Sequence, residues 1–236
     1  MNILIFGNGK MGKMIERLAT EHGHKIVAKI DIDTEIKNSF FDESDVAIEF
    51  TQPDAAVKNI TLCAQHKLPI VVGTTGWYEN LEKVKRIIDD NNSALLHATN
   101  FSIGVNIFFA VNKFLAHKMN LQTNYTPKIT EVHHTQKLDA PSGTAITTAE
   151  GIISEMSRFT HWSLNEKSET NAIKIISERI DSTPGTHTVV YDSFIDSLEI
   201  KHTAHSREGF ALGAITAAEW IVGKRGVFTM QNVLEI

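Results

Sequence analysis

The fold is decided by the stretch Asn2-Ile3-Leu4-Ile5-Phe6-Gly7-Asn8-Gly9-Lys10-Met11-Gly12. An apolar run typical of a buried strand passes directly into a glycine-rich turn of the form G-x-G-x-x-G. The tract that follows carries its apolar residues at helical spacing. A second strand over 25–30 then ends at Asp31. Strand, glycine turn, helix, strand and acidic residue in this order predict a dinucleotide-binding βαβ unit.

Each part of this pattern has a physical role toward a dinucleotide. Gly7 permits the tight turn, Gly9 lets the backbone approach the pyrophosphate, and Gly12 allows close helix-to-strand packing. The start of the helix favours the negative charge of the phosphates. Asp31 would accept hydrogen bonds from the adenosine ribose hydroxyls. The alternative is a glycine-rich turn in another α/β protein, but the complete context favours the dinucleotide.

The alternation of strands and helices continues beyond this unit. Strands are expected over 46–50, 69–73 and 94–98, and helices over 53–66 and 80–91. This alternation predicts a parallel sheet with helices on both faces, in which ligands bind beyond the carboxyl ends of the strands. Ligand contacts are therefore expected in the tracts 50–52, 73–76 and 98–102, although the first two could be plain turns.

The pattern changes after Ser102. A helix is expected over 103–119, a strand over 128–133 and a helix over 144–156. A polar loop over 163–170 precedes strands over 172–180, 186–191 and 198–203, whose short separations predict an open, largely antiparallel part of the sheet. A final helix over 209–222 returns to the first domain. The predicted architecture is an α/β Rossmann domain, residues 1–102 plus 208–236, with an inserted α+β domain, residues 103–207, built on an open mixed sheet.

A second motif, E-V-H-H-T-Q-K-L-D-A-P-S-G-T-A, spans Glu131 to Ala145. It places His133, His134 and Lys137 where a strand ends, and the run from Ser142 to Thr144 where a helix begins. Cationic side chains beside a helix N-terminus form a pocket suited to a carboxylate-bearing molecule. Taken alone, the motif could equally be a surface histidine pair followed by an ordinary N-cap.

Composition excludes several classes of protein. The net charge of -5 over 236 residues leaves no basic excess for binding nucleic acid. The 11 histidines are scattered without zinc spacing, so no metal is expected. The single cysteine, Cys63, cannot form an internal disulfide and fits a reducing compartment. The apolar tract 103–116 is interrupted by polar residues and is too short to span a bilayer. With no signal peptide visible, a cytoplasmic location without a membrane partner is expected.

The chain resembles the bacterial 4-hydroxy-tetrahydrodipicolinate reductase family, also called dihydrodipicolinate reductases, over essentially its whole length. The resemblance is carried by the Gly7–Gly12 loop, Gly73-Thr74-Thr75-Gly76, Asn100-Phe101-Ser102-x-Gly104-Val105-Asn106 and E-x-H-H-x-x-K-x-D-A-P-S-G-T-A. It implies NAD(P)H-dependent reduction of a small dicarboxylate ring in lysine and diaminopimelate biosynthesis. It also implies a Rossmann domain, a mixed α+β domain for substrate binding and oligomerisation, and a homotetramer. Closure of the two domains about residues 102 and 207 is expected.

The resemblance implies roles for individual residues. His133 would be the catalytic acid/base and Lys137 the proton donor. The expected substrate contacts are His134, Ser142, Gly143 and Thr144. The expected cofactor contacts are Gly7, Asn8, Gly9, Lys10, Met11, Gly12, Asp31, Gly73, Thr74, Thr75, Ala98, Thr99, Asn100 and Phe101.

Two departures from the family pattern bear on the cofactor. Many members carry arginine at the positions of Ile32 and Gln52. A 2′-phosphate needs such cations, whereas Asp31 suits a bare ribose and repels a phosphate. The sequence therefore predicts a preference for NADH over NADPH, with Lys29 or Lys10 as the cations that could still serve NADPH.

Two other functions remain open on the sequence. A related Rossmann reductase acting on an amino acid, such as an aspartate dehydrogenase, would share the first domain but lack the second motif. A dinucleotide-sensing binding protein would keep the Gly7–Gly12 loop but would have no need of His133 and Lys137 beside an anion site.

Overall fold

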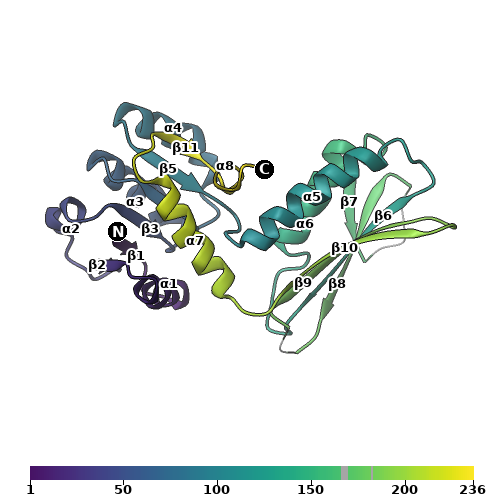
Figure 1. The fold of residues 1–236 in the computed structure, drawn as a ribbon, viewed down its shortest axis with the longest axis horizontal. Coiled ribbons are helices and arrows are strands. Elements are labelled where there is room, and N and C mark those ends of the chain that lie inside the picture. The colour runs from purple at the N-terminus through teal and green to yellow at the C-terminus, as the bar shows by residue number, and fades with distance from the viewer. Residues whose placement is uncertain (166–169, 182) are drawn as a thin grey trace. The chain divides into compact units, whose positions relative to one another are not determined.

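The computed structural model describes residues 1–165, 170–181 and 183–236. The chain forms two compact units, which are described separately (Figure 1). Unit 1 comprises Met1–Ile103 and Glu208–Ile236, and unit 2 comprises Gly104–Arg207. Within the described residues, the helices are too short or too polar to cross a membrane.

Unit 1 is built on a six-stranded sheet whose paired strands are all parallel, in the order β11-β5-β4-β3-β1-β2. The strand order reverses at β1, which lies between β2 and β3. This arrangement confirms the predicted Rossmann-type sheet, but the last strand was not predicted. The strands are β1 (Asn2–Phe6), β2 (Lys25–Ile30), β3 (Val46–Glu49), β4 (Ile70–Val72), β5 (Ala94–His97) and β11 (Gly226–Phe228).

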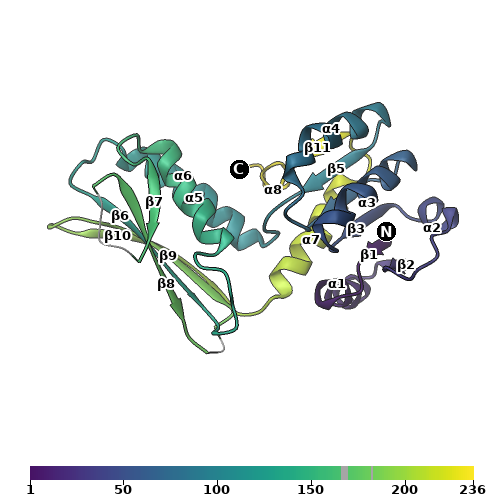
Figure 2. The same ribbon diagram turned by 180° about the vertical axis from the view of Figure 1, so that it is seen from behind.

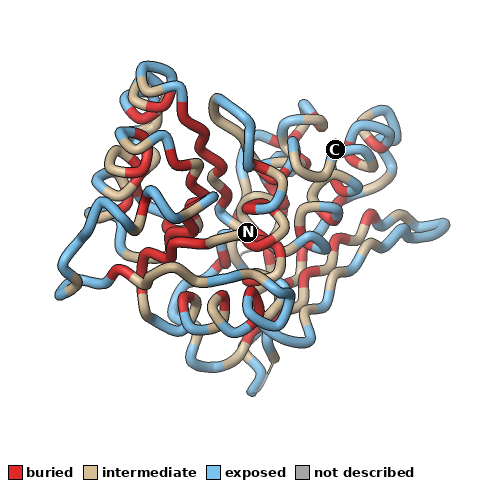
Figure 3. The backbone as a smooth tube through the Cα atoms, turned by 60° about the vertical axis from the view of Figure 1, so that its left-hand side comes forward, coloured by how far each residue is buried: buried red, intermediate tan, exposed pale blue. Residues whose placement is uncertain are grey.

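Helices cover both faces of this sheet (Figures 1 and 2). Side chains of β1 alternate between the faces: Ile3 and Ile5 pack with α1, α7 and α8, whereas Leu4 and Phe6 pack with α2, α3 and α4. Burial on both faces explains why the strands read as continuous apolar runs, and they appear in Figure 3 as buried segments. The helices are α1 (Lys10–Glu21), α2 (Asn38–Asp42), α3 (Pro53–Gln65), α4 (Leu81–Asp90), α7 (Glu208–Ile221) and α8 (Met230–Leu234), with a 3-10 turn, η1 (Tyr78–Asn80).

Two glycines let the first turn pack tightly. Gly7 has a φ of +100°, and a Cβ there would lie 2.2 Å from the carbonyl oxygen of Phe50. A Cβ at Gly12 would lie 2.0 Å from the carbonyl oxygen of Gly7. Both contacts are with backbone, which cannot rotate away. The loops after β1 and β3 and the start of α1 therefore fit together only with glycine at these positions.

The substitution Gly12→Ala is expected to lower the free energy of unfolding by roughly 1–3 kcal/mol, the usual cost of overpacking a core. Chemical denaturation would measure the change. Gly9→Ala is the matched control, because a Cβ at Gly9 would meet no described atom within 4 Å. Equal stability of the Gly12 variant and the wild type would contradict the packing role.

Unit 2 is built on a five-stranded sheet in the order β10-β9-β6-β8-β7. β9 pairs antiparallel with β10 and β6, whereas β8 pairs parallel with β6 and β7. The predicted mixed sheet is confirmed. The expectation that this part of the sheet is largely antiparallel is wrong for β8, which pairs parallel with both of its neighbours. The elements are α5 (Ile103–Met119), β6 (Thr126–His133), α6 (Gly143–Glu155), β7 (His161–Leu164), β8 (Ala172–Arg179), β9 (Gly185–Asp192) and β10 (Ser197–Ala204).

The loop expected over 163–170 is partly wrong. Ser163 and Leu164 end β7, which pairs with β8 from Ala172 onward. Residues 166–169 of that expected loop lie outside the described residues.

β6 is the central strand of unit 2. Its core-facing residues share one face with α5 and α6, where Ile129 packs in the apolar cluster. Further along the same face lie Glu131 and His133, at alternate positions of the strand. In the register, Glu131 lies opposite His187 on β9 and Ser177 on β8. Polar side chains from three strands therefore meet at one end of an otherwise apolar face.

Candidate active site

The start of α1 provides an anion-binding backbone in unit 1. Gly9 is the N-cap residue, and no described side chain caps this end of the helix. The first N–H groups of a helix lack intrahelical partners and favour an anion. Asn8 lies in the same loop, and its buried Oδ1 has no hydrogen-bond partner among the described residues. The space above Gly9 and the first N–H groups of α1 fit the phosphates of a dinucleotide, whereas the Asn8 oxygen can only accept from a donor such as a hydroxyl group.

The loops after β3 and β4 are tied together beside the glycine turn. The Thr51 amide donates to the Thr74 hydroxyl (2.8 Å) and to the Glu49 carboxylate (3.1 Å), which also accepts the Thr51 hydroxyl. Glu49 is fully buried, and this burial raises the pKa of its carboxyl group. Trp77 Nε1 donates to the Thr74 carbonyl (2.8 Å). Thr74 therefore fixes the loop, and its neighbour Thr75 is exposed.

The tract after β5 completes this edge of the sheet. Phe101 is buried and packs on Phe50, with ring centroids 5.9 Å apart. The Asn100 side chain accepts from the Ser102 amide (2.9 Å), and Thr99 is exposed. The carboxyl ends of β1, β3, β4 and β5 are adjacent in the sheet. The tracts predicted to contact a ligand after these four strands therefore line one edge of unit 1.

Asp31 lies at the end of β2, next to the glycine loop. The Gly7 amide donates to the carbonyl oxygen of the preceding residue, Ile30 (2.8 Å). Asp31 is exposed, and its carboxylate accepts from the amide of Ile32, a residue that is itself 94% exposed. Lys29 Nζ lies 2.7 Å from the Glu16 carboxylate. The acidic group is thus accessible, and one of the two lysines considered for a 2′-phosphate is already paired.

In unit 2, a buried carboxylate lies between two imidazoles. Glu131 Oε2 is 3.3 Å from His133 Nδ1 and 3.7 Å from His187 Nε2. All three residues are buried. Burial lowers the pKa of His187, and the neighbouring charge of Glu131 only partly opposes this effect. Burial therefore favours the neutral form of the His187 ring.

The Glu131 carboxylate has further donors around it. It accepts from the Ser142 amide (3.0 and 3.1 Å) and the Ser177 hydroxyl (2.7 Å), and Arg179 Nη2 lies 3.5 Å away. Burial on its own would raise the pKa of Glu131, but donors led by His133 and His187 hold that pKa far below its usual range. The carboxylate is therefore ionised throughout the physiological pH range.

Arg179 and Asp139 hold the loop that carries Lys137. Arg179 donates to the carbonyl oxygens of Asp139 (2.6 Å) and Lys137 (3.4 Å). Lys137 Nζ lies 2.7 and 2.8 Å from the Asp139 carboxylate oxygens. Partial burial opposes ionisation of Asp139, but the bond to Lys137 lowers its pKa below the ordinary value. The ammonium group is thus placed beside a carboxylate that a substrate carboxylate could replace.

The start of α6 lies against the same cluster. Ser142 is its N-cap, with a hydroxyl that accepts from the Ala145 amide (3.2 Å) and lies 3.1 Å from His187 Nε2. Gly143, the first residue of the helix, is exposed. His134 contacts Arg207, with 3.3 Å between Nε2 and Nη2.

The structure connects most of the predicted residues of unit 2. His133 and Ser142 are linked through Glu131, and the Lys137 loop is linked to the same carboxylate through Arg179. The carbonyl oxygen of His134 accepts from the Lys137 amide (3.1 Å), but its side chain lies beside Arg207. Sequence reasoning had not assigned a site role to Glu131, Arg179 or His187. The available signal was the alternation of Glu131 with His133 on one face of a strand.

The atoms of Glu131, His133 and His187 that could ligate a metal lie within 4.8 Å of one another. Glutamate and histidine are ordinary zinc ligands. The carboxylate, however, already accepts from Ser142 and Ser177 and lies beside the positive Arg179. The carboxylate therefore already has hydrogen-bond donors and a positive neighbour without an added cation.

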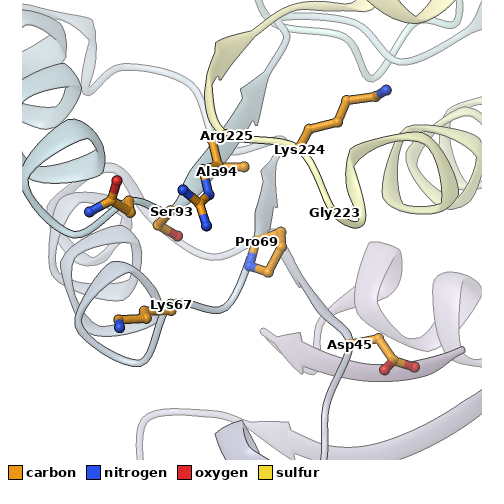
Figure 4. Close-up of a pocket in the computed structure, with 9 residues that line it drawn as sticks. Asp45, Lys67, Pro69, Ser93, Ala94, Gly223, Lys224 and Arg225 are labelled. Atoms are coloured by element: carbon orange, nitrogen blue, oxygen red, sulfur yellow. The ribbon is translucent and has the colours of Figure 1, made fainter.

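A cavity of about 470 Å³ lies at the opposite edge of the unit 1 sheet (Figure 4). It is lined by residues at the starts of the strands, among them Asp45, Pro69 and Ala94, and by three cations, Lys67, Lys224 and Arg225. The residues predicted to bind ligands lie at the other ends of the strands. Cations after helix C-termini stabilise the helix dipoles, which accounts for the positive lining without a ligand.

Comparison with known proteins gives one consistent result. A family model described as "Dihydrodipicolinate reductase, N-terminus" matches residues 1–101, and the corresponding C-terminal model matches residues 104–234. A 4-hydroxy-tetrahydrodipicolinate reductase of Christiangramia forsetii is 49% identical over 234 residues, which cover 99% of this chain and 98% of the relative. The Clostridium novyi enzyme of the same name is 36% identical, with 97% and 95% covered.

Solved structures agree on the fold. A dipicolinate-bound dihydrodipicolinate reductase from Paenisporosarcina sp. TG-14 superposes with a TM-score of 0.82 at 22% identity, covering 97% of each chain. An aspartate dehydrogenase from Thermotoga maritima superposes with a TM-score of 0.52 at 12% identity, covering 95% of this chain and 97% of the other. At these identities the likeness concerns architecture alone.

Proposed function

The chain belongs to the dihydrodipicolinate reductase family, and from this premise we propose how its residues reduce 4-hydroxy-tetrahydrodipicolinate. Membership makes it a pyridine-nucleotide-dependent oxidoreductase of lysine and diaminopimelate biosynthesis. The observation that carries the proposal is the cluster in unit 2, where the His133 ring, the Lys137 loop and the start of α6 share the buried Glu131.

We propose that this cluster binds a ring that carries two carboxylates. One carboxylate would lie at the start of α6, at Gly143 and Thr144, where the helix dipole and the backbone N–H groups of the first turn favour an anion. His134 or Lys137 would pair with it through a charge-assisted hydrogen bond. Binding would draw Lys137 from Asp139, which contacts its ammonium group in the structure.

We propose that the side chains of Lys137 and His133 deliver the proton. The ring hydroxyl leaves as water to give a conjugated ring, and a bound nicotinamide would then supply a hydride to an electron-poor carbon of that ring. Negative charge then builds at the ring-nitrogen end of the conjugated system, and a proton must arrive there. Lys137, with His133 as the acid/base partner, is the proposed source.

The dinucleotide is proposed to bind unit 1 along the carboxyl edge of its sheet, with NADH preferred. Asp31 is exposed and suited to accept from the ribose hydroxyls. Ile32 and Gln52 offer no positive charge to a 2′-phosphate, and Lys29 is paired with Glu16. Lys10 is the remaining cation at the loop that could support NADPH.

The substitution Asp31→Ala is expected to raise the dissociation constant for NADH roughly ten-fold or more, since a hydrogen bond to a charged acceptor contributes about 1.5–3 kcal/mol. NADPH binding should change little or improve, because a repulsive charge is removed. Fluorescence titration with both nucleotides measures this. Asp33→Ala, a nearby exposed carboxylate, is the control. Equal losses for the two nucleotides would show that Asp31 does not recognise the ribose.

The reaction is tested by the oxidation of NADH, followed by absorbance, in the presence of freshly generated pathway intermediate. Turnover is expected with this ring and not with a 2-oxo acid and ammonia, the pair that an amino-acid dehydrogenase reduces. A protein that oxidised NADH only with such a 2-oxo acid and ammonia would support the aspartate dehydrogenase alternative. A protein that bound NADH without turnover would support the dinucleotide sensor.

We also propose that the protein is a cytoplasmic homotetramer that assembles through unit 2. The face of the sheet opposite α5 and α6 carries Thr130, Val132, Ile176 and Val190, all only partly buried. Such a face suits association with further copies. Cys63 is buried and unpaired, which supports the reducing location. Analytical ultracentrifugation would test the assembly.

A further inference from the structure

Glu131 is the one acidic residue of the β6 motif that is fully removed from solvent. Its carboxylate contacts groups from β6, β8, β9 and the start of α6. A charge is rarely buried unless it is paired, because its desolvation is costly. The elements that carry the proposed catalytic groups are therefore built around this charge.

The first group that Glu131 orients is the His133 ring. Oε2 faces Nδ1 at 3.3 Å. A carboxylate beside one ring nitrogen favours the proton there and leaves the other nitrogen to exchange protons. On the opposite edge of the ring, glycine at position 185 leaves room for the imidazole, because a Cβ there would lie 3.1 Å from Nε2. Nδ1 faces the carboxylate at ion-pair distance.

The second group is the start of α6. Both carboxylate oxygens accept from the Ser142 amide, and the Ser142 hydroxyl caps the helix at Ala145. One side chain therefore fixes both the imidazole and the helix terminus proposed to hold the substrate carboxylate. His187 is the other imidazole beside Glu131, and its burial lowers its pKa. The guanidinium of Arg179 lies 3.5 Å from the same carboxylate.

We propose that Glu131 is a positioning residue: its negative charge orients His133 and stabilises the protonated ring before proton transfer, while its bond to Ser142 fixes the substrate-binding end of α6. This inference rests on the proposed function. The proton moves between His133 and the substrate, and Glu131 stays ionised throughout. Glu131 therefore does not contact the reacting atoms.

The test compares Glu131→Gln with Glu131→Asp. Glutamine keeps the shape and loses the charge, so kcat should fall about 10- to 100-fold, the usual effect of removing an orienting partner. The pH at which kcat declines on the alkaline side should also move lower, because an imidazolium without its counter-charge loses its proton more readily. Aspartate keeps the charge at a shorter reach, so kcat should fall while that pH stays in place.

Glu178→Gln is the matched control, since Glu178 is an exposed carboxylate on the neighbouring strand β8. It should leave both kcat and the pH profile unchanged. NADH binding by each variant, measured by fluorescence, together with thermal unfolding, shows whether the protein has folded.

Three results would overturn the inference. The first is that Glu131→Gln keeps the kcat and the pH profile of the wild type. The second is that Glu131→Gln has a lower kcat but an unchanged pH profile, which would indicate a packing role alone. The third is that Glu131→Asp keeps the kcat of the wild type. If the glutamine variant does not fold, the aspartate variant decides by its kcat and its pH profile. Failure of the wild type itself to oxidise NADH with the ring substrate would instead reject the proposed function.

Discussion

His133→Ala is expected to lower kcat by roughly two orders of magnitude or more, the usual share of a general acid or base. The imidazole lies at the end of β6 beside an ionised carboxylate, and alanine removes the only part of the side chain that can carry a proton. NADH binding should be unchanged, because the proposed nucleotide residues belong to unit 1. Steady-state oxidation of NADH at saturating substrate measures the change.

The control for this substitution is His161→Ala, an exposed histidine on β7 of the same unit. It should retain the kcat of the wild type. A kcat for His133→Ala within a few-fold of the wild type would show that this ring takes no part in proton transfer, and Lys137 alone would then remain for that role.

Lys137→Met should lower kcat/KM by about 100-fold or more, because the substitution removes both a proton donor and a charge-assisted bond to a carboxylate. Methionine retains much of the apolar stem, so the loop should stay folded, with Arg179 still holding its carbonyl oxygens. The measurement is kcat/KM at low concentrations of the ring substrate. Lys128→Met, an exposed lysine on β6, is the matched control.

The division of the loss between kcat and KM separates the two roles of Lys137. A rise in KM at constant kcat would mean that the ammonium group only binds the carboxylate. A fall in kcat at constant KM would mean that it acts in the transition state. No loss in either constant would contradict both roles.

The fold of unit 1 could be predicted because each signal in it is local. The continuous apolar strands, the glycine turn and the helical spacing after it all lie within short windows. β11 was missed because Gly226–Phe228 is only 3 residues long and partly buried, and α8 is a 5-residue helix. Such short elements are formed by packing against an existing sheet, and their own sequences carry little periodicity.

The strand order of unit 2 could not be predicted in the same way. The tracts that form β8 and β9 are close in sequence, which suggested direct pairing, yet β6 lies between them. The buried contacts explain this order: Glu131 on β6 accepts from Ser177 on β8 and lies beside His187 on β9. The order of strands in a sheet depends on contacts between residues that are far apart in the sequence. The periodicity of a single sequence contains no information about such contacts.

In the candidate site, too, the local signals could be predicted and the long-range contacts could not. The motif from Glu131 to Ala145 could be recognised as a compact string, and its imidazoles, lysine and helix start indicated the binding of an anion. Its dependence on Arg179 and His187 was hidden, because those residues are separated from the motif by more than a helix and a strand. The structure adds the partners that orient the recognisable groups.

Because β6 is paired on both sides, insertions and deletions within it are expected to be harmful. A single inserted or deleted residue before Glu131 would turn both Glu131 and His133 to the opposite face of the sheet, because side chains alternate along a strand. The apolar positions that anchor the strand would be misplaced in the same step. Loops on either side of β6 can therefore change in length, whereas the strand itself tolerates no gap. Screening a library of single-codon deletions across 126–133 would reveal this intolerance as a uniform loss of function.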